Sequence, residues 1–172
     1  MSTKKEVSLL QIFPKTAQVK NNRLFVGGCD CVELAENFGT PLYIFDKVAL
    51  LNRCEEFIKE FGSRYPNSTI AYACKAFTNR PMVTILKDTG VGLDVVSGGE
   101  IAIAQSAGFP PRNVFFHGNN KSEAELKQAI EWGIGRVVVD NFYEISLLEK
   151  VVAEQGKTQD ILLRLSPGID PH

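Results

Sequence analysis

The sequence lacks the features that mark membrane-spanning, secreted and metal-binding proteins. No apolar run approaches the ~18 residues of a membrane span, and the start MSTKKEVSLLQ has no long apolar segment like that of a secretory signal. Two histidines are too few for a metal cluster, and the four cysteines have neither zinc-ligand spacing nor that of a compact disulfide framework. We therefore expect a cytoplasmic protein without a metal site, whose cysteines are small buried thiols.

The charge balance excludes partners that are recognised by bulk electrostatics. Nineteen basic and twenty acidic residues leave a net charge of -1, so no overall field favours nucleic acid or an anionic membrane. The chain has 172 residues, of which 44% are hydrophobic and 23% charged, and this is ordinary for a globular domain with a real core. We expect no nucleic acid or membrane partner, and a small molecule as the ligand.

Short apolar runs alternate with amphipathic helical runs from residue 69 onward. The predicted strands are residues 69–75, 92–96, 114–117, 136–140 and 161–165. Two helices carry clear signals. One begins at Ser122, with Glu125 three residues later as in a capping box, and stops at Gly133; the next begins at Asn141 and stops at Gly156. We interpret Glu144 and Glu149 on the second helix as solvated.

The polar residues at the ends of these strands give the repeat its period. Lys75, Asp94, His117, Asp140 and Arg164 are separated by 19, 23, 23 and 24 residues, which is one strand, one helix and two short loops per unit. The alternative fold is a doubly wound sheet, although no G-x-G-x-x-G follows the first strand. The regular helices favour an α/β fold of the TIM type, a (β/α)8 barrel.

The barrel is incomplete in this sequence. A complete barrel needs eight units and roughly 250 residues, whereas this chain offers five strands, so we expect a fragment of a longer polypeptide. The segment before the barrel differs, because residues 22–46 hold two strand candidates around a short helix. We predict that residues 1–46 are the lead-in from a β-rich second domain. Residues 47–172 are then the first part of the barrel, beginning with a helix at 47–62.

One lysine stands out chemically. In AYACKAFTN, Lys75 ends a run that otherwise suits a strand covered on both faces. A lysine in an apolar strand end can lose its charge through desolvation, which makes the amine a nucleophile for Schiff-base formation. Pyridoxal 5'-phosphate (PLP) is the cofactor most often held in this way. The alternative is a lysine that reaches out to solvent.

Each neighbouring polar residue also has a structural alternative. Asp94 either lies near a cofactor or pairs with Lys75 or caps the next helix. His117 is a site residue or a hydrogen-bonded core histidine, and Arg164 binds an anion or extends to the barrel rim. Gly98 and the glycine after it could offer backbone N–H groups to an anion, which is a weak signal alone.

Longer motifs add a family resemblance. They are YACKA, GLDVVSGGEIAIAQSAGFPPRNVFFHGNNKSEAEL, GIGRVVVDNFYEISLLE and ILLRLSPGID. From about Leu24 onward the chain closely resembles the diaminopimelate decarboxylase family, PLP-dependent enzymes of the alanine-racemase-like class. The resemblance implies a PLP barrel joined to a β-domain, a homodimer in the full-length protein, and decarboxylation of meso-diaminopimelate to L-lysine and CO2, the last step of lysine biosynthesis.

The resemblance also implies roles by position. Lys75 matches the lysine that bonds covalently to PLP, Asp94 an aspartate near the cofactor, and His117 the H-G-N motif at the rim of the site. The predicted cofactor site comprises Ala73, Lys75, Asp94, Ser97, His117 and Arg164. The family's phosphate site, the carboxylate that holds the pyridine nitrogen and the cysteine contributed across the dimer match nothing up to His172. We therefore expect these 172 residues alone to be inactive.

Two other functions remain open. One is a decarboxylase of another basic amino acid, of the ornithine or arginine type, on the same scaffold. The other is a non-catalytic PLP-binding protein, although such proteins usually lack a strand-rich lead-in like that at residues 23–46. The blandest interpretation is a metabolite-binding barrel fragment in which Lys75 is structural.

Overall fold

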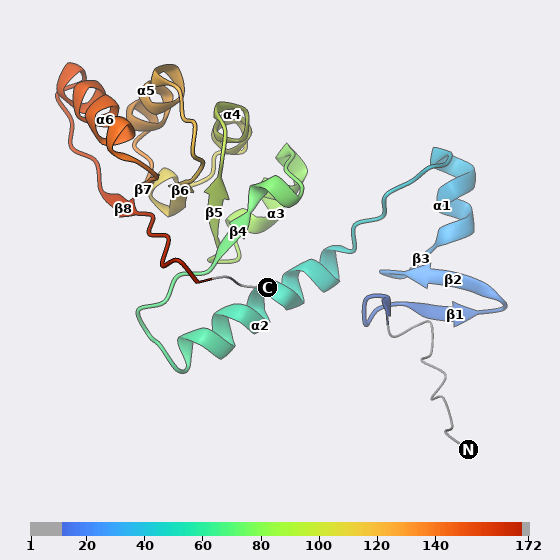
Figure 1. Ribbon diagram of the computed structural model, residues 1–172. Coiled ribbons are helices and arrows are strands. Elements are labelled where there is room, and N and C mark those ends of the chain that lie inside the picture. Colours follow the sequence, from blue (N-terminus) through green and yellow to red (C-terminus); the bar gives the residue numbers. More distant parts are fainter. Residues whose placement is uncertain (1–11, 170–172) are drawn as a thin grey trace. The chain divides into compact units, whose positions relative to one another are not determined.

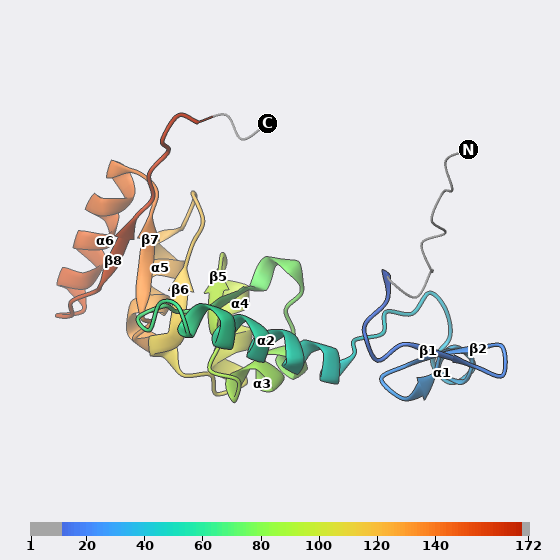
Figure 2. The same ribbon diagram turned by 90° about the horizontal axis from the view of Figure 1, so that it is seen from below.

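The computed structural model describes residues 12–169, and Figures 1 and 2 show it from two directions. The first eleven residues of the predicted lead-in, and the last three residues of the chain, lie outside the described residues. The chain divides into two compact units, Met1–Lys59 and Glu60–His172. The division falls inside helix α2 (Lys47–Gly62), whose bounds match the helix expected from the sequence.

The first unit contains a three-stranded antiparallel sheet. Its strands are β1 (Gln18–Lys20), β2 (Arg23–Val26) and β3 (Cys29–Asp30), in the order β1-β2-β3. Two-residue turns join them, at Asn21–Asn22 and Gly27–Gly28, and all four turn residues have positive φ. Such turns match the twist of a hairpin, and they explain why Asn and Gly stand at these positions.

Helix α1 (Cys31–Phe38) follows the sheet directly. The Asp30 carboxylate accepts hydrogen bonds from the backbone N–H groups of Val32 and Glu33 and so caps the helix. The same carboxylate lies 2.7 Å from Arg23 Nε on the neighbouring strand. One aspartate therefore fixes both the start of α1 and its attachment to β2.

The predicted strand after α1 is wrong for this chain. The sequence pattern of Leu42–Phe45 predicts a strand, but the structure has no strand there. The apolar side chains of this segment are exposed. A strand exists only where its backbone N–H and C=O groups pair with another strand. No strand among residues 12–169 pairs with this segment.

The second unit is built on a parallel sheet of five strands. These are β4 (Ala71–Ala73), β5 (Gly92–Val95), β6 (Val114–Phe116), β7 (Arg136–Val139) and β8 (Ile161–Leu163). Each strand pairs in parallel with the next one along the chain, in the order β4-β5-β6-β7-β8. A doubly wound sheet reverses its strand order, and this one does not. The predicted five strands of a partial TIM-type barrel are thereby confirmed.

The strands are shorter than the sequence predicted. All five predicted strands continue one or two residues further than the observed ones, and Lys75, His117, Asp140 and Arg164 therefore follow their strands instead of lying at the ends of them. Asp94 is the exception, because it lies inside β5. Residue preference does not decide where pairing stops; the last hydrogen bond to the neighbouring strand does.

Helices connect the strands. They are α3 (Arg80–Lys87), α4 (Gly98–Ser106), α5 (Glu123–Trp132) and α6 (Phe142–Glu154), with single turns η2 (Cys74–Ala76) and η3 (Pro111–Asn113). Consecutive helices contact one another, and Figure 1 shows them in a row beside the sheet. The predicted capping box of Ser122 and Glu125, the cap at Asn141 and the stop at Gly133 are all confirmed.

The core lies between this helical row and the sheet. Leu93, Val114 and Val137 on the strands, and Ile101 and Leu126 on the helices, are completely buried. Their burial provides the main free energy for the layer, about 1.5–3 kcal/mol for each large side chain. The packing holds the carboxyl ends of the strands at one edge.

The outer strand β8 is the least covered part of the sheet. All three of its residues are exposed, and the Leu163 side chain retains 61% of its accessible area. Leu165, just beyond the strand, is also exposed. An apolar strand with a free edge is a template for pairing with another chain.

We expect a polypeptide of these 172 residues to self-associate through β8. Replacing Leu163 and Leu165 together by Glu should reduce the associated fraction at least twofold, because each buried Å² of apolar surface contributes ~25 cal/mol to association. Size-exclusion chromatography with light scattering measures this. Phe142→Glu, at an exposed position away from the edge, is the control and should change little. A compact monomer with a cooperative melt would contradict the expectation.

Candidate active site

The candidate site lies at the carboxyl ends of the parallel strands. Because the strands run in the same direction, the residues that follow them gather at one edge of the sheet. These residues are Lys75 after β4, Ser97 after β5, His117 after β6, Asp140 after β7 and Arg164 after β8. The edge thus brings an amine, an imidazole, a guanidinium and carboxylates to one side of the sheet.

Lys75 lies in the turn η2, two residues beyond Ala73, the last residue of β4. The turn is braced by the Tyr72 hydroxyl, which donates to Phe77 O at 2.8 Å, and by the Thr78 hydroxyl, which donates to Cys74 O. Lys75 is exposed, in contrast to the apolar surroundings that the sequence predicted. Within residues 12–169 its ammonium makes no hydrogen bond or ion pair, so the amine is available for reaction.

Asp94 in β5, the neighbour of β4, forms a pair with His117, which directly follows β6. Asp94 is the register partner of Ala73 on one side and of Phe115 on the other. The backbone N–H of His117 donates to the backbone oxygen of Val95 at 2.8 Å. This pairing brings His117 Nδ1 into hydrogen-bond contact with Asp94 Oδ1. Both side chains are partly exposed, at 41% for His117 and 26% for Asp94. The alternatives in which Asp94 pairs with Lys75 or caps a helix are wrong in this structure.

The pairing has a chemical consequence for the imidazole. A carboxylate at Nδ1 favours the tautomer that carries its proton there, which leaves Nε2 free to accept or donate a proton. Nε2 makes no hydrogen bond to the part of the chain that the structure describes. His117 is therefore a group oriented by Asp94, and the alternative of a core histidine does not fit its exposure.

Ser97 acts as the cap of α4. Its hydroxyl accepts the Glu100 N–H at 3.3 Å, while the Glu100 carboxylate accepts the Val96 N–H at 2.7 Å. The Gly98 N–H, which the sequence offered as an anion ligand, donates instead to Glu125 Oε1 at 2.8 Å. That expectation is wrong for Gly98, because a protein carboxylate already occupies the donor.

The Glu125 carboxylate is held in its charged form. Its pKa is lowered, chiefly by the hydrogen bond from the Ser122 backbone N–H and further by the one from Gly98, against the opposing effect of burial. One glutamate thus joins the start of α5 to the start of α4. This link fixes the loop after β5 next to the loop after β6.

Arg164 lies at the far end of the edge. Its Nη1 donates to Asp140 Oδ1 at 3.0 Å, and its backbone N–H donates to Val139 O at 2.9 Å. The guanidinium is 59% exposed, so the interpretation of a side chain that reaches the rim fits, and most of its donors remain available to an anion. Asp140 was not among the predicted site residues, although the strand-end period contained it.

Sequence reasoning missed a second pair beneath this edge. Lys121 and Glu144 form an ion pair at 2.6 Å, and their side chains are only 1% and 4% exposed. The prediction that Glu144 is solvated is therefore wrong. The available signal was its position three residues after Asn141, which matches the Glu of a capping box.

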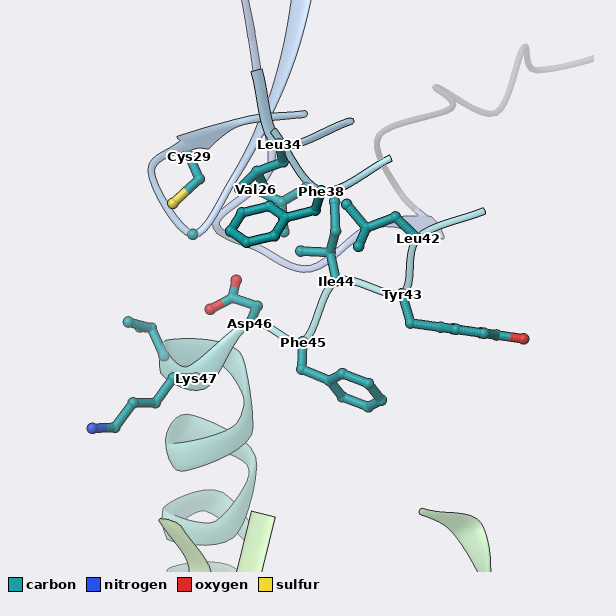
Figure 3. A pocket seen from close by; sticks show the side chains of 12 residues that line it. Val26, Cys29, Leu34, Phe38, Leu42, Tyr43, Ile44, Phe45, Asp46 and Lys47 are labelled. Carbon is teal, nitrogen blue, oxygen red and sulfur yellow. The ribbon is translucent and has the colours of Figure 1, made fainter. Parts of the chain in front are cut away.

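A pocket of the first unit has a different character. Its volume is about 480 Å³, and Figure 3 shows apolar side chains such as Val26, Leu34 and Ile44 around it. Its one carboxylate, Asp46, accepts hydrogen bonds from the Thr16 hydroxyl and the Ala49 N–H; the Thr16 bond is the main cause of its lowered pKa. The pocket is suited to apolar packing, and it contains none of the predicted site residues.

Metal-ligand clusters and membrane-spanning helices are both absent from the described residues. Across residues 12–169, no three His, Cys, Asp or Glu side chains come together in a way that could hold a metal ion. In the same range no helix combines the length and apolar character needed to cross a membrane.

Comparison with known proteins shows which family the chain belongs to. The sequence model of a family described as pyridoxal-dependent decarboxylase, pyridoxal binding domain, matches residues 49–172. This chain belongs to the pyridoxal-dependent decarboxylase family. Membership confirms, at the level of the family, the PLP cofactor predicted from the sequence.

Individual members of the family refine the comparison. The chain is 46% identical over 155 residues to a diaminopimelate decarboxylase of Bacillus subtilis (strain 168), a match that covers 90% of this chain and 35% of that protein. A structure of diaminopimelate decarboxylase from M. jannaschii with L-lysine is 35% identical, with a TM-score of 0.83, over 92% of this chain and 37% of that one.

A lysine/ornithine decarboxylase from Vibrio vulnificus, solved with cadaverine, is 25% identical, with a TM-score of 0.65, over 80% of this chain and 35% of that chain. The names of these relatives give different substrates, so the pyridoxal-dependent decarboxylase scaffold carries more than one substrate specificity. The chain spans about a third of the length of the relatives it matches.

The residues present fit one end of PLP. The cofactor's aldehyde needs an uncommitted amine, and Lys75 is exposed and makes no bond within the described range. The oriented His117 ring lies on a nearby strand end, where an acid–base group is useful. The phosphate end has no comparable fit at Gly98, because Glu125 accepts its N–H.

Cys74, next to Lys75, tests the local geometry. Burial raises the pKa of its thiol to about 11, so little thiolate exists at pH 8. We expect a thiol reagent at pH 8 to modify Cys74 at least about a hundredfold more slowly than the exposed Cys29. Peptide mass spectrometry measures both rates, and unfolding in guanidinium should equalise them. Equal rates in the folded protein would contradict the buried position.

Proposed function

We propose that this chain supplies the N-terminal part of a PLP-dependent decarboxylase that converts meso-diaminopimelate to L-lysine and CO2. The observation that carries the proposal is the exposed Lys75, without a hydrogen bond or ion pair among residues 12–169, at the same strand edge as the Asp94–His117 pair. The 46% identity to the Bacillus subtilis diaminopimelate decarboxylase supports the substrate. A longer polypeptide supplies the remaining strands, and the 172 residues alone are inactive.

We propose the following organisation for that polypeptide. Residues 1–46 lead in from a β-rich domain, and residues 47–172 begin the barrel; the antiparallel sheet of the first unit supports a β-rich neighbour. The complete enzyme is a homodimer in the cytoplasm and takes a small amino-acid substrate. The phosphate site, the carboxylate for the pyridine nitrogen and the cysteine from the second subunit lie in the continuation.

Each site residue has a proposed role. PLP, when bound, stabilises the electron pair that decarboxylation leaves on the α-carbon. The Lys75 amine would hold the cofactor, and its exposure makes it accessible to the cofactor and to the substrate. Ala73 ends the strand that Lys75 follows, and Ser97 follows the adjoining strand β5. Asp94 holds the His117 ring at Nδ1, so that Nε2 is the nitrogen left for the substrate or cofactor.

Arg164 contributes charge. Its guanidinium keeps one bond to Asp140, and its other donors suit a carboxylate or phosphate oxygen. We assign it to the binding of an anionic group of the cofactor or substrate. The bond to Asp140 limits the directions in which the long side chain can extend.

One alternative has a specific observation in its favour. The structural similarity to the Vibrio vulnificus lysine/ornithine decarboxylase means that a decarboxylase of another basic amino acid fits the same fold. The non-catalytic alternative has less support, since the strand-rich first unit is unusual for it. Substrate preference separates the first alternative from the proposal, and turnover separates the second.

Lys75 is the first test. In the longer polypeptide, borohydride reduction should fix PLP to the peptide that contains Lys75. Lys75→Ala should lower turnover at least about a thousandfold, while the fold remains, because the residue is exposed and packs against little. Lys87→Ala, at the end of α3, is the matched control and should retain activity. Labelling of another lysine would disprove the assignment.

Substrate preference is the second test. We expect the ratio kcat/KM for meso-diaminopimelate to exceed that for ornithine, arginine or lysine by about 10⁴-fold. A site built to pair a second ammonium and carboxylate leaves buried polar groups unmatched when a simpler amino acid enters. Release of CO2 from each substrate measures the ratio. Preference for any of the three simpler amino acids would favour the alternative decarboxylase.

A further inference from the structure

Lys121 occupies an unusual position for a lysine. Its side chain is buried beneath the loop that follows β6, and its ammonium has three partners: Gly118 O at 2.7 Å, Val138 O at 2.7 Å and Glu144 Oε1 at 2.6 Å. An ammonium has three protons, so every donor is used. The Phe116 ring centroid, 5.4 Å from Nζ, adds a cation–π contact.

The three partners belong to different segments of the chain. Gly118 directly follows His117 and adopts φ +112, a conformation that favours glycine. Val138 lies in β7, and Glu144 lies in the first turn of α6. One buried charge thus ties the turn after His117 to the neighbouring strand and helix.

Glu144 extends the connection. Its Oε1 accepts the hydrogen bond from Lys121 Nζ, and its Oε2 accepts the one from the Asp140 backbone N–H at 3.0 Å. The Glu144 N–H in turn donates to Asn141 Oδ1 at 2.9 Å. The pair therefore fixes the backbone of Asp140, whose carboxylate holds Arg164, as well as the backbone next to His117.

This arrangement is better explained by geometry than by stability. Replacing a buried ion pair with apolar side chains is often neutral for stability, because desolvation of the two charges offsets their attraction. Apolar replacements cannot, however, bind the carbonyl oxygens of Gly118 and Val138. The bond to Gly118 O ties the turn after His117 to the buried ammonium, and the bond to Val138 O ties that ammonium to β7.

We infer that Lys121 is a positioning residue: its ammonium, paired with Glu144, fixes the turn after His117 and thereby holds the imidazole against Asp94 at the edge that carries Lys75. The inference deepens the proposed function and rests on it for its catalytic meaning. The position of the imidazole can be measured without turnover.

The test uses two double variants of the longer polypeptide. Lys121→Met with Glu144→Leu removes both charges and keeps apolar volume. Lys121→Gln with Glu144→Gln removes both charges and keeps polar groups. Neither variant leaves a lone buried charge. The control makes the first two changes in an exposed pair between α5 and α6, Lys150→Met with Glu123→Leu, whose ion pair spans 3.0 Å.

The main readout is the nitrogen NMR spectrum of protein with labelled histidine. His117→Gln identifies the His117 signal by its loss, and Asp94→Asn shows where that signal lies when the carboxylate partner is absent. We expect both double variants to melt cooperatively and to move the His117 signal toward the Asp94→Asn position. The Lys150/Glu123 control should leave the signal in place. A general loss of stability does not produce this selective shift.

PLP titration provides the second readout. We expect the dissociation constant for PLP to rise roughly tenfold in the double variants, as is common when the supports of a binding group are removed. An unmoved His117 signal in a folded double variant would overturn the inference. So would failure of both variants to fold, because the pair would then serve folding alone. A shifted signal in a protein that binds no PLP would uphold the inference and reject the proposed cofactor.

Discussion

The sequential parallel pairing of β4 to β8 is the constraint on which the second unit depends. Each strand pairs with the next one in the chain, so every strand ends at the same edge and every connecting helix returns along the sheet. Residues about 20 positions apart, such as Asp94 and His117, become neighbours because they lie at the ends of adjacent strands. The chemistry at the edge is therefore a consequence of backbone hydrogen bonding and chain direction.

Three consecutive helices use one device at that edge. α4, α5 and α6 each begin with a capping Ser or Asn, followed three residues later by a glutamate whose carboxylate folds back onto a backbone N–H. In α5 and α6 this glutamate also reaches a neighbouring loop or a buried lysine. The same local capping pattern thus has two roles, because it starts the helix and joins adjacent βα loops.

Local patterns could be predicted from the sequence, and contacts across the chain could not. The Ser122–Glu125 capping box spans three residues, so the sequence contains all of its determinants. The Lys121–Glu144 pair spans 23 residues, and nothing near Glu144 shows that a lysine from another loop will reach it. The Asp94–His117 pair is intermediate: the repeat placed both residues at one edge, but the contact depends on the register of β5 with β6. The strand predicted at Leu42–Phe45 is absent for a related reason, because an apolar run forms a strand only when another strand pairs with it.

The glutamates at the helix starts also determine where a phosphate can bind. The first turn of a helix ordinarily attracts anions, through the partial positive charge of its free N–H groups. In α4, α5 and α6 a carboxylate of the protein itself already lies against that turn, so a phosphate dianion approaching it meets negative charge. This part of the barrel therefore carries Lys75 but disfavours the cofactor's anionic end at the starts of α4, α5 and α6. The phosphate of a cofactor held by Lys75 would need donors other than these three helix starts.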